Sequence, residues 1–93
     1  MILDKFGTVE SLARFLQLGG YHGMRGSRYH NPVCLYLRTQ YPHARHVRTG
    51  LTMAHVRYSK YKCTVIRFPP IVQQFIRAFN GGEFPELEER YPL

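Results

Sequence analysis

The stretch that organises this chain is residues 19–32, GGYHGMRGSRYHNP. It combines four glycines with two arginines, two histidines and a serine, and it ends on Asn-Pro. Asn31 is a good helix N-cap, and Pro32 suits the first helical position, where no amide hydrogen is needed. A glycine-rich, positively charged loop is therefore predicted to lead directly into the N-terminus of a helix.

This loop has the chemistry of an anion-binding site. Free amides and the positive end of the helix dipole favour an anion at a helix N-terminus. Glycines let backbone amides turn toward such a ligand, and the forked guanidinium groups of Arg25 and Arg28 can hold phosphate oxygens. We expect a phosphate-bearing ligand here, in contact with Arg25, Ser27, Arg28, His30 and Asn31.

Length and composition indicate one globular domain. The chain has 93 residues, enough for a modest core but not for two. No apolar run approaches the ~20 residues that a membrane span requires, and the opening MILDKFG is not typical of a secretory signal. We expect a cytoplasmic protein without a membrane partner.

Charge is distributed unevenly along the chain. Between Ser11 and Gly82 there is no aspartate or glutamate, whereas eleven lysines and arginines lie in the same span. Four of the six acids follow it, at Glu83, Glu86, Glu88 and Glu89. A body this basic indicates a nucleic acid, another phosphate-bearing ligand or an acidic protein surface as the partner.

We therefore divide the chain into a basic α+β domain, residues 1–82, and an acidic C-terminal tail, residues 83–93. Opposite charges attract over ~10 Å in physiological salt, and Phe84 and Leu87 can add an apolar anchor. We expect the tail to lie against the basic surface of its own chain or of a second copy, in a monomer or a homodimer. The alternative is a solvated end.

The lack of acids excludes several kinds of chemistry from the body. Neither the carboxylate pairs of glycosidases and aspartic proteases nor the carboxylate shells that hold magnesium or calcium can come from it. His43 and His46 precede a predicted strand, and the other histidines and cysteines lack the paired spacing of zinc sites. We expect no metal and no cofactor, and binding rather than catalysis.

The two cysteines, Cys34 and Cys63, are expected to be reduced and buried, since no secretion signal is present. Cys34 falls in the first turn of the helix that begins at Pro32, where the helix dipole favours a thiolate, and His30 lies just before it. The alternative is therefore an enzyme that uses His30 and Cys34.

Apolar spacing and end signals predict three helices, at residues 9–18 after an N-cap at Thr8, at residues 32–41, and at residues 71–80 before Gly81. Between the last two helices the pattern changes to strands, the first at residues 46–50 and then a hairpin. The predicted order is α-α-β-β-β-α. This is an α+β fold with helices packed on one face of a three-stranded antiparallel sheet.

The predicted register of the hairpin assumes that Ser59 and Lys60 form a two-residue loop. The pairs that result on the apolar face are Tyr58 with Tyr61, Val56 with Cys63, and Ala54 with Val65. On the other face Arg57 lies opposite Lys62, where either solvent or a bound anion separates the two charges. Ser-Lys is a poor two-residue turn, so a longer loop is the alternative.

The sequence Gly23-Met24-Arg25-Gly26 lies between two predicted helices and resembles the GxxG loop of KH domains, which clamps a nucleic-acid backbone. The KH loop joins its helices directly, whereas here residues 27–31 intervene. The strand that should precede the first helix is also hardly present. We therefore transfer no KH residue or function to this chain.

The predicted function is that of a small basic module for nucleic acid or another phosphate-bearing ligand. Aromatic and basic residues alternate in the hairpin, and such mixtures bind single strands by stacking bases and holding phosphates. Besides the loop residues, the expected contacts are Arg45, Arg48, Arg57, Lys60 and Lys62. The alternative is an inhibitor or adaptor that docks on an acidic protein surface.

Overall fold

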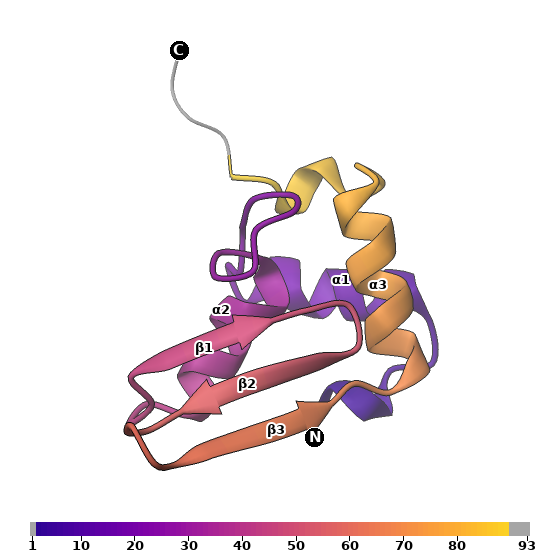
Figure 1. Cartoon of the computed structure of the whole chain (residues 1–93). Helices are drawn as coiled ribbons and strands as arrows, with labels where there is room; N and C mark the ends of the chain where they lie inside the picture. The colour runs from indigo at the N-terminus through magenta and orange to yellow at the C-terminus, as the bar shows by residue number, and fades with distance from the viewer. Residues whose placement is uncertain (1, 90–93) are drawn as a thin grey trace.

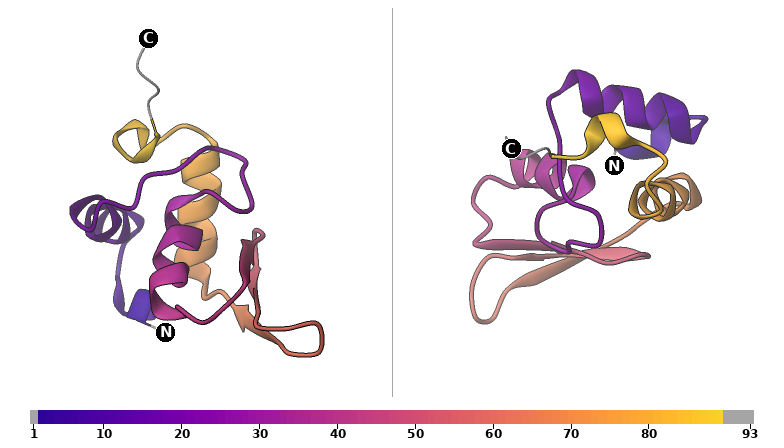
Figure 2. Two further views of the ribbon diagram at one scale, coloured as in Figure 1. Left: turned by 90° about the vertical axis from the view of Figure 1, so that its left-hand side faces the viewer. Right: turned by 90° about the horizontal axis from the view of Figure 1, so that it is seen from above.

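The computed structural model describes residues 2–89 and confirms the predicted α+β architecture (Figure 1). The elements are, in chain order, η1 (Ile2–Lys5), α1 (Val9–Leu18), α2 (Pro32–Gln40), β1 (His46–Thr49), β2 (Met53–Arg57), β3 (Cys63–Arg67), α3 (Pro70–Asn80) and η2 (Pro85–Leu87). The antiparallel sheet has the order β1-β2-β3, with the helices on one face (Figure 2). Among the described residues, no helix lies on the outer face.

The helix ends follow from local hydrogen bonds, as predicted. The N-cap of α1 is Thr8, whose side chain accepts the amide hydrogen of Ser11 at 3.0 Å. Asn31 caps α2 in the same way by accepting the amide hydrogen of Cys34 at 2.9 Å. Gly81 is the C-cap of α3. Each signal acts within four residues, which is why the sequence shows it.

The core lies between the helices and the inner face of the sheet. Alternate strand residues point inward, so Val47, Ala54 and Val56 are buried under α2 and α3. Both ends of the described chain add a fully buried side chain, Leu3 at the start and Leu87 at the end.

The β2–β3 hairpin has a different register from the predicted one. Arg57 pairs with Cys63, so Arg57 does not oppose Lys62, and the connection is the longer Tyr58–Lys62. Two-residue turns need residues that adopt positive φ readily, and Ser-Lys lacks them. Instead the Tyr58 amide donates to the Lys62 carbonyl at 2.9 Å and closes the larger loop.

This shift of one residue turns β3 over. Thr64 and Ile66 lie opposite Val56 and Ala54 on the inner face. Cys63 and Val65, predicted to face the core, instead lie on the outer face, where Val65 is 50% exposed. The two cysteines are free, as predicted, but only Cys34 is buried.

Cys63 should react with iodoacetamide in the native protein, whereas Cys34 should not. Cys63 is exposed; Cys34 is buried, and burial raises the pKa of its thiol despite the opposing influence of Arg38. Mass spectrometry of the labelled peptides should find Cys63 modified alone until denaturant is added. A protected Cys63 would instead support the register with the two-residue loop.

Candidate functional site

The glycine-rich loop between α1 and α2 is closed by its own backbone. The Met24 amide donates to the His30 carbonyl at 2.7 Å, and Ser27 Oγ accepts the His30 amide at 3.0 Å. At Gly23 a Cβ would come within 2.6 Å of the Asn31 Cα, so a side chain does not fit there. The loop therefore folds back onto the start of α2.

Asn31 joins this loop to both α2 and the sheet. In addition to capping α2, its Nδ2 donates to the Ser27 carbonyl at 2.8 Å and to Thr49 Oγ1 on β1. The residue is only 7% exposed. Both amide hydrogens are used inside the protein, so Asn31 shapes the loop and has no donor left for a ligand.

The acidic tail lies against the glycine-rich loop of its own chain, as the charge distribution predicts. Glu88 Oε1 lies 2.9 Å from Arg25 Nε, and Glu89 Oε2 lies 2.8 Å from His30 Nε2. Two of the predicted phosphate contacts, Arg25 and His30, are therefore already paired with carboxylates.

Backbone and apolar contacts hold the tail in place as well. The Gly23 amide donates to the Leu87 carbonyl at 2.9 Å, and the Glu89 amide donates to the Gly23 carbonyl at 2.8 Å. Leu87 is fully buried, and the ring of Phe84 lies 5.5 Å from that of Phe75, measured between centroids. Residues 84–89 are therefore integrated into the fold.

The outer face of the sheet carries the main group of unpaired cations. The register places Arg48 opposite His55 and His46 opposite Arg57. These four side chains and Tyr29 line a hollow of about 240 Å³, which we call the outer-face hollow. Among the described residues, neither arginine has a carboxylate partner.

Tyr29 reaches this hollow because the glycine-rich loop runs beside β1. The Thr49 amide donates to the Arg28 carbonyl at 2.8 Å, and the Arg38 guanidinium donates to the Tyr29 carbonyl at 2.7 Å. These bonds hold Tyr29 at the sheet edge, where it is 51% exposed. An aromatic ring therefore borders a group of cations.

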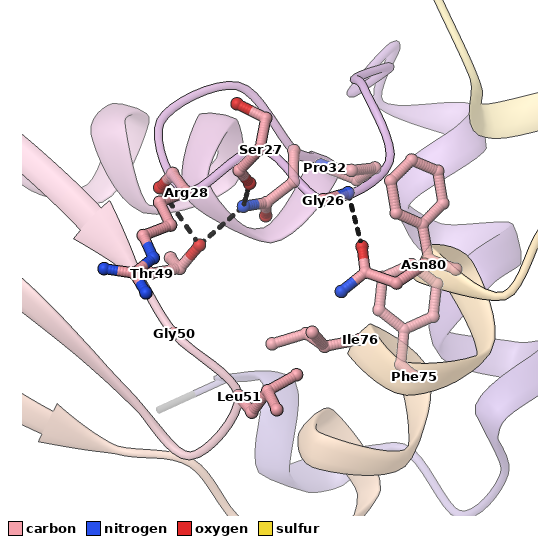
Figure 3. Close-up of a pocket in the computed structure, with 12 residues that line it drawn as sticks. Gly26, Ser27, Arg28, Pro32, Thr49, Gly50, Leu51, Phe75, Ile76 and Asn80 are labelled. Atoms are coloured by element: carbon pink, nitrogen blue, oxygen red, sulfur yellow. Dashed lines mark hydrogen bonds between the residues drawn. The ribbon is translucent and has the colours of Figure 1, made fainter.

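The remaining predicted contacts lie in other places. Arg45 is exposed just before β1, and Lys60 and Lys62 are exposed in the hairpin loop, with ammonium groups 5.7 Å and 5.2 Å from the ring centroids of Tyr61 and Tyr58. Ser27, Arg28 and Asn31 line a separate pocket on the helix side of the sheet (Figure 3). The structure thus divides the predicted residues among the loop and tail, the sheet with its hairpin, and this pocket.

Sequence reasoning missed three residues of the outer-face hollow: Tyr29, His46 and His55. The two histidines were detectable, because they alternate with the buried residues of their strands. Tyr29 had no such signal, since its position depends on how the glycine-rich loop packs against β1.

The chemistry of the described residues favours binding over catalysis. The buried Cys34 donates its thiol hydrogen to the Val47 carbonyl at 3.2 Å, and its raised pKa disfavours the nucleophilic thiolate. In residues 2–89 no group of three or more His, Cys, Asp or Glu side chains is arranged to hold a metal. No helix in this part of the chain has both the length and the apolar character needed to cross a membrane.

Comparison with known protein families, with curated proteins and with solved structures finds no match to this chain. The functional proposal therefore depends on the side chains of the outer-face hollow and their surroundings.

Removing the tail carboxylates should strengthen binding to a polyanion such as heparin. In Glu88→Gln/Glu89→Gln the backbone contacts remain, but Arg25 and His30 are released from their ion pairs. We expect heparin affinity at low salt to rise about two- to fivefold, the scale of exposed ion pairs, as measured by titration calorimetry.

The matched control is Glu83→Gln/Glu86→Gln, which removes the same charge from exposed positions that make no ion pair within the described residues. Its heparin affinity should rise less. Equal gains in the two variants would mean that net charge alone, and not the specific pairing with the loop, limits polyanion binding.

Proposed function

We propose that this protein binds single-stranded nucleic acid on the outer face of its sheet. The observation that carries the proposal is the outer-face hollow, in which two arginines without carboxylate partners and two histidines lie beside an exposed tyrosine ring. Guanidinium groups hold phosphate oxygens, and aromatic rings stack on bases.

The shape of this surface supports a single strand as the ligand. Bases of a single strand are exposed and can lie on an open sheet whose face carries aromatic and basic side chains. Here the sheet face is free of helices, and its described strands contain no acid that would repel phosphate. Exposed Lys60 and Lys62 extend the positive charge toward the hairpin loop.

The tail has a moderating role in this proposal. Because Glu88 and Glu89 neutralise Arg25 and His30, the glycine-rich loop attracts polyanions less than its sequence suggests. Binding is thereby directed to the sheet, and non-specific attraction is reduced. We further propose that the protein acts in the cytoplasm, where reducing conditions suit its two free thiols.

Loss of both hollow arginines should weaken binding more than loss of two arginines elsewhere. Arg48→Ala/Arg57→Ala removes two cations from the hollow, and Arg14→Ala/Arg77→Ala removes the same charge from exposed positions on α1 and α3. For a labelled oligonucleotide measured by fluorescence anisotropy, binding to the first variant should be weaker by about 1–3 kcal/mol.

A salt titration adds a second readout. The slope of log affinity against log salt should fall by about 0.7 for each phosphate of the single strand that the variant no longer neutralises, and only in the hollow variant. Equal decreases in both variants would show diffuse attraction in place of a site. If no oligonucleotide binds but an acidic protein does, the surface belongs to the alternative class of protein-interaction modules.

The role of the aromatic ring can be tested separately. Tyr29→Ala should weaken oligonucleotide binding by about 1–3 kcal/mol, the usual value of one stacked base, while Tyr29→Phe should retain most of the affinity. The same anisotropy assay measures both. Unchanged affinity in Tyr29→Ala would remove base stacking from the proposal and leave only the phosphate contacts.

A further inference from the structure

A pocket of about 160 Å³ lies between the glycine-rich loop, the β1–β2 turn and α3 (Figure 3). We call it the α3 pocket. Its apolar part is formed by Pro32, Leu51, Phe75, Ile76 and Phe79. The apolar walls and small volume suit a flat ring that leaves water to enter them.

A hydrogen-bond donor of Asn80 is directed into this pocket. Asn80 Oδ1 accepts the Gly26 amide hydrogen at 2.9 Å, which assigns the oxygen to the loop side and leaves the NH₂ group on the pocket side (Figure 3). Among the described residues, this NH₂ group has no acceptor. A ligand with a carbonyl oxygen would supply one.

Arg28 provides a second free donor at the rim of the pocket. The side chain is exposed, and its guanidinium makes no ion pair or hydrogen bond within the described part of the chain. The pocket thus combines apolar walls, one neutral donor and one cation. This combination suits a flat ring that carries a carbonyl group and is linked to a phosphate.

The volume selects the size of the ring. An apolar cavity of about 150 Å³ is large enough to hold one benzene molecule. The α3 pocket, at about 160 Å³, therefore has room for one six-membered ring but not for the two fused rings of a purine. Cytosine, uracil and thymine all have a single ring with a carbonyl at O2, which can accept from Asn80.

The α3 pocket and the outer-face hollow are built by the same two chain segments. Arg28 lines the pocket and the next residue, Tyr29, lines the hollow; likewise Arg48 lines the hollow, and Thr49 and Gly50 line the pocket. Adjacent residues are about 3.8 Å apart at Cα. A strand on the outer face can therefore pass over the edge of β1 and reach the pocket.

We propose that the α3 pocket binds one pyrimidine base of a single-stranded nucleic acid, with Asn80 donating to O2 and Arg28 contacting a phosphate. The inference rests on the proposed function and adds a base preference to it. The outer face supplies affinity for any single strand, and the pocket distinguishes pyrimidines from purines.

The test compares oligo(U) with oligo(A) of equal length by fluorescence anisotropy, using wild-type protein, Asn80→Asp and a control. Asn80→Asp keeps an oxygen acceptor for the Gly26 amide but replaces the donor with a negative charge. Gln17→Glu makes the same charge change at an exposed position on α1 that does not line the pocket. Thermal unfolding of all three proteins checks the fold.

We expect the wild type and Gln17→Glu to prefer oligo(U) by about tenfold, on the scale of one buried hydrogen bond with its ring contacts. In Asn80→Asp the preference should disappear, while oligo(A) affinity should match that of Gln17→Glu within about twofold. Equal affinity of the wild type for the two oligonucleotides would overturn the pyrimidine pocket and leave the proposed function standing.

A second measurement needs no variant and no oligonucleotide. In a titration of the wild type with uridine monophosphate, followed by NMR, the Gly26 backbone amide and the Asn80 side-chain amide should shift, and adenosine monophosphate should shift them less. This response without binding of either oligonucleotide would support the pocket and overturn the proposed function. No response to uridine monophosphate would overturn the pocket itself.

Discussion

The arrangement of this protein depends on one buried side chain, the amide of Asn31. It accepts from the first turn of α2 and donates to the glycine-rich loop and to β1, so three segments share one residue. Each buried polar group left without its partner would cost about 1–3 kcal/mol, which keeps the three segments together. The loop is consequently held beside β1, and this places Arg28 at the α3 pocket and Tyr29 at the outer-face hollow.

The distribution of carboxylates then decides which basic surface stays available. The tail acids that make ion pairs within the described residues both bind the glycine-rich loop, where backbone hydrogen bonds to Gly23 fix their position. Such exposed pairs contribute little stability on their own, so the burial of Leu87 is the stronger anchor. The result is a loop with reduced positive charge and a sheet whose outer arginines, within residues 2–89, have no carboxylate partner.

The strand register determines the character of that sheet. Because side chains alternate, the pairing of β1 with β2 places His46, Arg48, His55 and Arg57 together on the outer face. The pairing of β2 with β3 adds Val65 and Cys63 to the same face. A basic surface is thereby extended by a small exposed apolar strip, which is compatible with contacts to both phosphates and bases.

The sequence by itself determined the three helices, their capping residues, the element order and the presence of a tail that pairs with the basic body. These features arise from hydrogen bonds within four residues, from apolar spacing, or from opposite charges, all of which are visible along the chain. The arginines of the sheet were also named from charge alone.

Only the tertiary structure decided the β2–β3 register, the position of Tyr29 and the direction of the Asn80 amide. A poor two-residue turn left the loop length open, and one residue of difference moved Cys63 from the core to the surface. Gly26 and Asn80 are 54 residues apart in the chain, so no local pattern relates them. Contacts between such distant residues depend on how the loop and α3 pack, and that packing is a property of the whole fold.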